Sequence, residues 1–272
     1  MDAALELAEQ TGPDLIIAND PDADRCAVGV PGPGGWRMLT GDELGTLLGW
    51  HLLQRGLVGP DECFANSIVS SRMLAAVCRA AGVRHEDTLT GFKWIARAPG
   101  VRYGYEEALG YCVAPEHVLD KDGISAALLV AELTATLKAA GRTVPDVLDE
   151  LAAAHGVHHT GAFAVRVEDL AVIGRIMARL RARPLDSVAG IDTERVDDLL
   201  LGEGGLPPTD GLRYYLADGS RVIVRPSGTE PKLKIYLEVI EPATGGDVKA
   251  ARGRAAYRLA ALTNAFREAT AP

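Results

Sequence analysis

The sequence lacks long apolar runs, is poor in cysteine and carries no excess of positive charge. No apolar run reaches the roughly 18 residues of a membrane span, so we expect no membrane-embedded segment. The acidic start M-D-A-A-L-E has a helical pattern, which argues against a secretory signal. The four cysteines share no ligand-like spacing, which predicts reduced thiols in a cytoplasmic protein rather than a disulfide framework.

The charge balance and the length narrow the function further. A formal net charge of −9 disfavours nucleic acid as a partner, because surfaces that bind nucleic acid are normally basic. An anionic small molecule would have to be attracted by local groups of Arg and Lys rather than by the whole surface. The 272 residues leave room for two domains or slightly more, and 47% hydrophobic with 24% charged residues is typical of a globular chain.

A loop rich in phosphate-binding groups lies near the end of the chain, between two runs with the pattern of strands. These runs are residues 221–225 (R-V-I-V-R) and 233–239 (L-K-I-Y-L-E-V). Between them, R-P-S-G-T-E-P-K offers a guanidinium, two hydroxyls, a glycine and an ammonium. Arg presents a planar fork to phosphate oxygens, and backbone N–H groups of a tight turn can bind an anion. A solvated β-turn is the alternative. Lys234 is expected to lie along the second strand and to contribute little to the loop.

Three carboxylates follow a strand-like apolar run near the N-terminus. Residues 15–18 (L-I-I-A) lead into N-D-P-D-A-D-R, which places Asp20, Asp22 and Asp24 at alternate positions of an extended loop. Ligand sets made only of oxygen suit a hard cation, so this loop predicts a Mg²⁺ site. An EF-hand is rejected because its sixth and twelfth positions require Gly and Glu, and here they are Arg25 and Pro31. An Asp-rich surface turn is the alternative.

Four motifs in a fixed order resemble those of one enzyme family. D-P-D-A-D-R (residues 20–25) is followed by T-G-F-K (90–93), G-Y-E-E-A-L-G-Y (104–111) and R-P-S-G-T-E-P (225–231). The series resembles the metal loop, active-site lysine segment, sugar-binding loop and phosphate loop of the α-D-phosphohexomutases, the phosphomannomutases and phosphoglucomutases. The resemblance runs along nearly the whole chain. It implies an enzyme that isomerises a sugar phosphate, with Mg²⁺ as its cofactor.

The resemblance assigns roles to the residues of these motifs. They are, for Mg²⁺, Asp20, Asp22 and Asp24; for catalysis, Arg25 and Lys93; and for the substrate, Glu106, Glu107, Arg225, Ser227, Gly228, Thr229 and Lys232. Within this set Glu106 is expected to bind the sugar hydroxyls, and Glu107 beside it is expected to be solvated. The alternatives are a local salt bridge for Arg25 and an unbound surface lysine at position 93.

The resemblance also predicts a missing part. Family members carry the phosphoryl group on a serine in a segment that reads T-A-S-H-N-P or similar, and this chain contains no such segment. The chain therefore resembles the C-terminal half of a mutase, and we expect it to be inactive without a separate N-terminal half. Ala108 and Tyr111 replace a serine and a histidine that are common in the family. This departure leaves the sugar undetermined and keeps a phosphopentomutase as an alternative.

Two hypotheses from other classes stay open. D-P-D after an apolar strand also resembles the nucleophile motif of haloacid-dehalogenase-type phosphatases, although Arg25 and the phosphate loop fit that family poorly. The second hypothesis is a non-catalytic protein that binds sugar phosphates, and the absent serine segment motivates it.

The order of strand and helix patterns predicts an α/β fold in three parts. Residues 1–38 read as the remnant of a domain that carries the metal loop. Residues 39–158 read as an α/β sugar-binding domain with a mixed, largely parallel sheet, and residues 159–272 as an α+β phosphate-binding domain with an antiparallel sheet. Residues 185–208 have no pattern that assigns them to a strand or a helix.

Local signals mark some of the element ends. T-G-D-E at residues 40–43 is a capping box that starts a helix. Asp122 is expected to cap a second helix, which carries Ile124, Leu128, Leu129 and Leu133. D-G at residues 218–219 separates two strand-like runs and predicts a hairpin with a type I′ turn.

Overall fold

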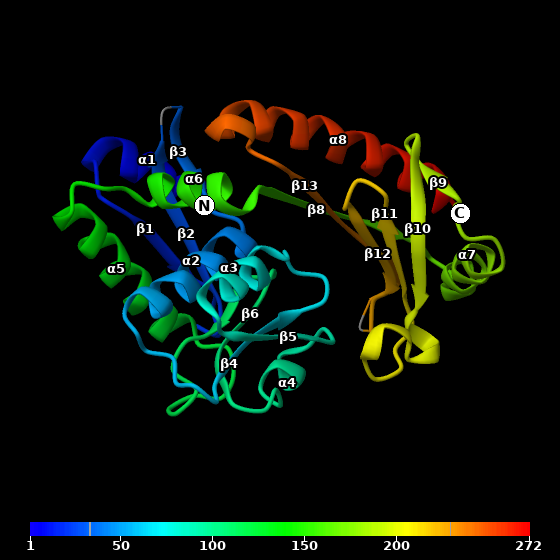
Figure 1. The fold of residues 1–272 in the computed structure, drawn as a ribbon, viewed down its shortest axis with the longest axis horizontal. Helices are drawn as coiled ribbons and strands as arrows, with labels where there is room; N and C mark the ends of the chain where they lie inside the picture. The colour runs from blue at the N-terminus through cyan, green and yellow to red at the C-terminus, as the bar shows by residue number, and fades with distance from the viewer. Residues whose placement is uncertain (33, 229) are drawn as a thin grey trace. The chain divides into compact units, whose positions relative to one another are not determined.

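The computed structural model describes residues 1–32, 34–228 and 230–272, and these form two compact units, Met1–His155 and Gly156–Pro272 (Figure 1). The first unit contains α1 (Asp2–Thr11), β1 (Ile16–Asn19), β2 (Cys26–Gly32), β3 (Gly35–Met38), α2 (Gly41–Gln54), β4 (Cys63–Ser67), α3 (Met73–Ala81), β5 (Arg84–Thr88), α4 (Phe92–Ile95), β6 (Val101–Glu106), β7 (Gly110–Cys112), α5 (Gly123–Ala139) and α6 (Val144–His155). The second contains β8 (Val157–Arg166), α7 (Leu170–Ala182), β9 (Ser187–Val188), β10 (Ile191–Asp198), η1 (Leu199–Leu201), η2 (Glu203–Gly205), β11 (Leu212–Leu216), β12 (Arg221–Pro226), β13 (Lys232–Glu241), η3 (Thr244–Gly246) and α8 (Val248–Ala269).

The first unit is a mixed α/β structure with two sheets. One sheet has the order β5-β4-β6-β7, in which β4 pairs in parallel with β5 and β6, and β7 pairs antiparallel with β6. The other sheet is the antiparallel meander β1-β2-β3. Helix α2 packs against α3 and β6, and α5 packs against β2 and β7. The loops at the carboxyl ends of β4, β5 and β6 therefore share one edge of the mixed sheet, where ligand sites of α/β proteins form.

The predicted helix starts are confirmed in the first unit. At α2 the Thr40 hydroxyl accepts from the Glu43 N–H at 3.1 Å, and the Glu43 carboxylate accepts from the Thr40 N–H at 2.9 Å. Asp122 caps α5 by accepting from the N–H groups of the first helical residues. Of the four apolar residues expected along α5, Leu133 is buried and Leu129 packs against the core, whereas Ile124 and Leu128 are 60% and 71% exposed. This helix is apolar around most of its circumference, so periodicity alone does not identify the buried side.

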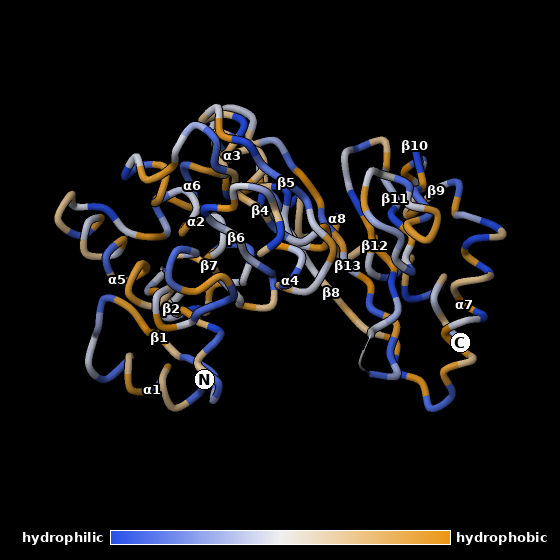
Figure 2. Tube along the Cα trace, turned by 90° about the horizontal axis from the view of Figure 1, so that it is seen from below, coloured by the Kyte–Doolittle hydropathy of each residue, from blue (hydrophilic) through white to orange (hydrophobic). Residues whose placement is uncertain are grey.

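The second unit is a six-stranded antiparallel sheet with helices on one face. The strand order is β8-β13-β12-β11-β10-β9, and every pair is antiparallel. Helix α8 packs along β13 and β8, as Figure 1 shows, and α7 contacts β13. Buried residues recur at helical spacing along α7 at Ile173, Ile176, Met177 and Leu180. The alternation of hydrophobic and hydrophilic colour along α7 in Figure 2 matches a helix with one buried side. The expected α/β fold with an antiparallel C-terminal sheet is confirmed.

Two local expectations in the second unit need correction. Strands β11 and β12 form the predicted hairpin, but only Gly219 has a positive φ, of +81°, so the turn is not type I′. The N–H of Leu216 donates to the carbonyl of Ser220, which closes a three-residue loop with glycine in the left-handed position. The unassigned stretch 185–208 forms β9, β10 and the two short helices η1 and η2.

Within the described ranges, no single helix has both the length and the apolar composition of a membrane span. The bent pair α5 and α6, at 90° to each other, passes that test only when its two helices are counted together.

Candidate functional site

The loop that carries the three aspartates is a compact turn between the antiparallel strands β1 and β2. Ala23 has a left-handed backbone with φ of +58°, and its N–H donates to the carbonyl oxygen of Asp20 at 2.9 Å. The Asp20 carboxylate accepts from the N–H of Arg25 at 3.2 Å and lies 3.4 Å from the Arg25 guanidinium. The amide of Asn19 donates to the Arg25 carbonyl at 2.8 Å. The expected extended loop is therefore wrong, because these local hydrogen bonds fold it back on itself.

The start of α5 closes against this loop. The N–H of Gly123 donates to the Ala23 carbonyl at 3.0 Å, and a Cβ at position 123 would lie 2.7 Å from that oxygen and closer still to the Arg25 carbonyl. Only glycine permits this approach. Lys121 places its ammonium 2.6 Å from Asp24 Oδ2, and this hydrogen bond lowers the pKa of Asp24. Sequence reasoning missed Lys121, whose only signal was its place directly before a helix cap.

The chemistry of this loop fits a hard divalent cation. Asp24 Oδ1 is buried, and no described residue donates a hydrogen bond to it. An incoming cation would satisfy such an oxygen, and carboxylates are preferred Mg²⁺ ligands. In this structure, however, Asp20 pairs with Arg25, Asp24 pairs with Lys121, and Asp22 is exposed. Across residues 1–32, 34–228 and 230–272, no three Asp, Glu, His or Cys side chains are grouped as metal ligands.

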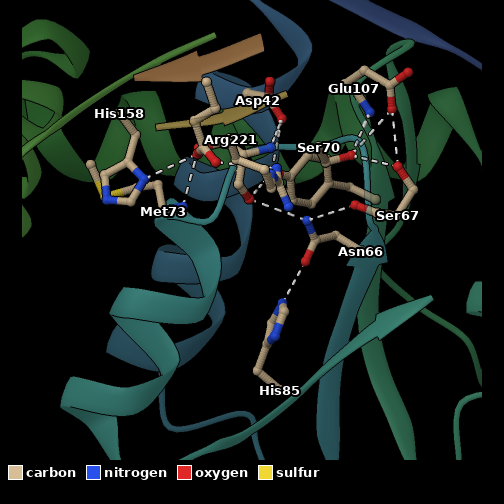
Figure 3. A network of polar contacts seen from close by, with 12 residues as sticks. Asp42, Asn66, Ser67, Ser70, Met73, His85, Glu107, His158 and Arg221 are labelled. Atoms are coloured by element: carbon tan, nitrogen blue, oxygen red, sulfur yellow. Dashed lines mark hydrogen bonds and ion pairs between the residues drawn. The ribbon is translucent and has the colours of Figure 1, made fainter. Parts of the chain in front are cut away.

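The two glutamates at the end of β6 have different partners. Glu106 Oε1 accepts from the N–H of Gly91 at 2.7 Å, which ties it to the T-G-F-K segment. Glu107 Oε2 accepts from the hydroxyls of Ser67 and Ser70 at 3.1 Å and 3.2 Å (Figure 3). The expectation that Glu107 is solvated is wrong, because β4 and the turn after it provide these hydroxyls and partly bury its carboxylate.

The surroundings of Glu107 favour its neutral form. Burial raises the pKa of Glu107 to about 7, and the negative charges of Asp42 and Glu106 add to this increase. The hydrogen bond from Ser67 acts in the opposite direction but does not offset burial. Sequence reasoning missed the contacts of Ser67 and Ser70 with Glu107. Only the three-dimensional approach of β4 to β6 reveals it.

The acidic loop and the glutamate turn are neighbours in the first unit. Leu109, in the turn, has a left-handed backbone with φ of +67°, and its carbonyl accepts from the N–H of Cys26 at 3.1 Å. Arg25 and Gly110 form an isolated antiparallel bridge beside this bond. The structure therefore brings the Asp-rich loop next to the turn that carries Glu106 and Glu107.

Lys93 lies on the short helix α4, two residues after Gly91. Its side chain is exposed, and its ammonium lies 5.6 Å from the centre of the Trp94 ring. Gly91 itself has φ of +106°, a conformation that other residues rarely adopt. The segment is thus anchored through Gly91 and Glu106, while the lysine stays accessible.

In the second unit, the predicted phosphate loop joins β12 to β13. The N–H of Ser227 donates to the carbonyl of Lys232 at 2.9 Å, which closes the loop. The ammonium of Lys232 pairs with Glu230 and lowers its pKa. Gly228 is exposed, and Thr229 lies outside the described residues.

Four basic residues share one face of the sheet at this end. The register places Arg225 opposite Lys234, and Lys232 opposite Arg166. Cross-strand partners and residues two apart on one strand project from the same face, so all four lie together. Lys234 lies on the second strand, β13, as expected, and its small contribution to the loop stays a prediction. Sequence reasoning missed Arg166. The Arg225 guanidinium makes no hydrogen bond or ion pair with any other residue that the structure describes.

Comparison with known proteins identifies the family. Residues 40–155 match the family model "Phosphoglucomutase/phosphomannomutase, alpha/beta/alpha domain III". Residues 162–252 match the model "Phosphoglucomutase/phosphomannomutase, C-terminal domain". The chain therefore belongs to the phosphoglucomutase/phosphomannomutase family. This confirms the family that the motifs resemble, and the haloacid-dehalogenase hypothesis is wrong.

Individual relatives place the chain within this family. It is 42% identical over 250 residues to the "Probable phosphomannomutase" of Haemophilus influenzae, covering 92% of this chain and 50% of that protein. It is 33% identical over 273 residues to the human "Phosphopentomutase", covering 89% and 44%. The fold is similar to that of the phosphoglucomutase parafusin from Paramecium, with a TM-score of 0.67, 23% identity, and 95% and 45% coverage. The chain spans about half the length of the relatives it matches.

Proposed function

We propose that this chain is the substrate-binding and metal-binding part of a phosphohexomutase. The full enzyme would interconvert the 1- and 6-phosphates of mannose or glucose through an enzyme phosphoserine and a bisphosphate intermediate. The proposal rests on the position of the Arg225 guanidinium on a basic sheet face, where it pairs with none of the described residues, in a chain of the mutase family. Arg is suited to this role because its planar fork pairs with two phosphate oxygens.

The phosphate loop would hold the substrate phosphate that does not react. Arg225 and Lys232 would supply charge, and Ser227, Gly228 and Thr229 would supply hydroxyls and backbone N–H groups. Glu106 would accept hydrogen bonds from the sugar hydroxyls, in the orientation that Gly91 gives it. Binding the substrate at both its phosphate and its sugar hydroxyls orients the reacting phosphate. The reacting groups are then already in position, which lowers the entropic part of the barrier.

The loop of residues 20–25 would hold Mg²⁺ through Asp20, Asp22 and Asp24. The bound cation would supply positive charge that stabilises the phosphoryl group during transfer. Arg25 and Lys93 would add charge from the protein, and Lys93 or its neighbours would move the proton of the attacking hydroxyl. The support for this assignment is the buried, unpartnered Oδ1 of Asp24 and the oxygen-only donor set.

We further propose that turnover requires the phosphoserine-bearing part of the mutase in addition to these 272 residues, and that the protein acts in the cytoplasm without nucleic acid or a membrane as partner. In this scheme residues 1–38 belong to the domain of the metal loop, 39–158 form the sugar-binding domain and 159–272 the phosphate-binding domain. The four cysteines are buried and unpaired, which fits a reducing compartment.

A pentose phosphate is the second candidate substrate. Phosphopentomutases are among the relatives at 33% identity. Tyr111 is fully buried, with its hydroxyl 3.4 Å from the Gly41 carbonyl, and Ala108 has no polar atoms in its side chain. Positions 108 and 111 therefore provide no hydrogen bond to a substrate hydroxyl, which suits a sugar with fewer hydroxyls to satisfy. A non-catalytic sugar-phosphate-binding fragment is the third candidate.

The proposal is tested by calorimetric titration with mannose 1-phosphate, glucose 1-phosphate and ribose 1-phosphate. We expect Arg225→Ala to weaken binding about 10- to 100-fold, because hydrogen bonds to a charged group contribute about 1.5–3 kcal/mol. Lys249→Ala, on the exposed side of α8, is the matched control and should bind as the wild type does. Equal losses in the two variants would contradict the role of the loop.

Catalysis is tested with the purified 272-residue chain alone and after addition of the N-terminal half of a related mutase. We expect turnover only in the mixture. Robust activity of the chain alone, free of contaminating mutase, would overturn the requirement for a second part. Binding without turnover in both samples would favour the non-catalytic candidate.

A further inference from the structure

Three side-chain groups form a closed ring beneath the glutamate turn. The hydroxyls of Ser67 and Ser70 lie 2.9 Å apart, and each lies within 3.2 Å of Glu107 Oε2. Figure 3 shows this triangle between the end of β4 and the turn after β6. Ser67 and Ser70 are buried, so bulk water does not supply alternative partners on that side.

The number of hydrogens in this ring depends on Glu107. When its carboxyl is ionised, the two serine hydroxyls provide at most two hydrogens for three close oxygen–oxygen contacts, and one contact is then repulsive. When the carboxyl is protonated, a third hydrogen is present and each contact can be a hydrogen bond. The geometry of the ring therefore fits the protonated acid.

The charged groups around Glu107 also favour its protonated form. Asp42 at the start of α2 and Glu106 in the same turn are both acidic, and both raise the pKa of Glu107. Asp42 is itself buried and accepts from the Ser71 N–H at 2.7 Å and the Tyr105 hydroxyl at 3.1 Å. A second negative charge at Glu107 would be repelled by Asp42 and, in the same turn, by Glu106.

The turn that carries both glutamates has little room to adjust. The N–H of Glu107 donates to Ser70 Oγ at 3.1 Å. A Cβ at Gly41 would lie 2.6 Å from the carbonyl carbon of Glu107, so the backbone of α2 fills the space behind the turn. Leu109 has a left-handed conformation that is costly for a residue with a side chain. A change in the position of the Glu107 carboxylate must therefore be passed to Glu106, its neighbour in the chain.

We propose that Glu107 is a positioning residue. While its carboxyl group is protonated, Glu107 holds Glu106 against the Gly91 N–H, and when this group ionises, Glu106 is no longer held there. The importance of this for substrate rests on the proposed function, in which Glu106 binds the sugar. Glu107 itself does not touch the substrate in this scheme. It acts through the turn, and its proton makes sugar-phosphate binding depend on pH.

The expected effect follows from the protonated fraction. With a pKa of about 7 for Glu107, only about one molecule in 30 is protonated at pH 8.5. If only the protonated form is competent to bind, the apparent affinity falls by that factor. The neutral isostere Glu107→Gln should not show this loss. The second ionisation of the phosphate, near pH 6, affects both proteins equally and cancels in their ratio.

The test has one measurement that needs no ligand. The backbone ¹H–¹⁵N signal of Gly91 reports the hydrogen bond to Glu106 and is followed between pH 5.5 and 9. We expect it to move with a midpoint near pH 7 in the wild type and in the exposed control variant Glu116→Gln, but not in Glu107→Gln. A signal that titrates equally in Glu107→Gln, or in neither protein, would overturn the proposal.

A second measurement links the turn to the substrate. Calorimetric titration with glucose 1-phosphate at pH 6.5 and 8.5 should show up to about a 25-fold larger loss for the wild type than for Glu107→Gln. Equal losses would overturn the inference while leaving the proposed function intact. If neither protein binds at pH 6.5, the proposed function fails, and the Gly91 signal alone decides whether Glu107 positions Glu106.

Discussion

Replacing Glu107 by Gln should stabilise the first unit at alkaline pH but not at acidic pH. The substitution keeps the shape of the neutral acid and removes its ability to ionise. In the folded chain the pKa of Glu107 is about 7, compared with 4.5 for a glutamate in water. Folding therefore favours the protonated form, so the folded state binds more protons than the unfolded state between these two values. The free energy of unfolding of the wild type should fall as pH rises through this window.

The size of the change in unfolding free energy follows from the difference between the folded and unfolded pKa values of Glu107. At about 1.36 kcal/mol for each pH unit, the wild type should lose about 3 kcal/mol relative to Glu107→Gln between pH 4.5 and pH 8. If the Gln side chain also changes the unfolding free energy by an amount that does not depend on pH, the plot of this free energy against pH is shifted but keeps its slope. For a unit of 155 residues the same difference corresponds to about 6–12 °C in Tm.

The assay is urea unfolding followed by tryptophan fluorescence from pH 4.5 to 8.5. All three tryptophans, at positions 36, 50 and 94, lie in the first unit, so the signal reports that unit alone. Glu116→Gln makes the same chemical change at an exposed position and should follow the wild type at every pH. Parallel curves for Glu107→Gln and wild type would refute the argument, because they would show that Glu107 ionises as freely in the folded protein as in the unfolded one.

Two further predictions concern the acidic loop. Lys121→Gln should raise the affinity for Mn²⁺ or Mg²⁺ by about 2- to 5-fold in calorimetry, because it removes a cation that pairs with Asp24; Lys138→Gln, which breaks an exposed pair with Asp14, should change nothing. A weaker metal affinity in Lys121→Gln would contradict this view of the lysine. Gly123→Ala should destabilise the first unit by about 1–3 kcal/mol in urea unfolding, since its Cβ would meet the loop backbone. Gly253→Ala, with open space around it in α8, should instead be neutral or stabilising by up to about 1 kcal/mol, and equal effects at the two glycines would argue against the close approach.

The sequence predicts features that depend on neighbours in the chain. The capping box at Thr40, the Asp122 cap and the hairpin of β11 and β12 are local, and each forms where its residues indicate. The order of the strand and helix patterns predicts the fold class for the same reason. The type I′ assignment failed because the dipeptide Asp-Gly does not specify how many residues the loop contains.

Features that depend on the approach of distant segments were not predictable from single residues. The pairing of Asp24 with Lys121 joins positions 97 residues apart, and the contact of Ser67 with Glu107 spans 40 residues. The choice of which side of α5 is buried also depends on distant segments, because a helix that is apolar on several sides is oriented by its neighbours. Motif similarity predicted Glu107 as a site residue, but only the fold shows that its partners are serines rather than solvent.

The charged candidate residues of the two units fall into two groups that should contribute differently to binding. Asp20, Asp24 and Lys232 already have partners of opposite charge within the chain, namely Arg25, Lys121 and Glu230. A ligand or cation at these positions must displace the internal partner, and the exchange of one ion pair for another yields little net free energy. Arg225 makes no ion pair with any residue that the structure describes, and its positive charge is strengthened by Lys234 on the same sheet face. Phosphate affinity should therefore depend mainly on Arg225. At the paired residues, an added cation or anion can bind only if it replaces the internal partner.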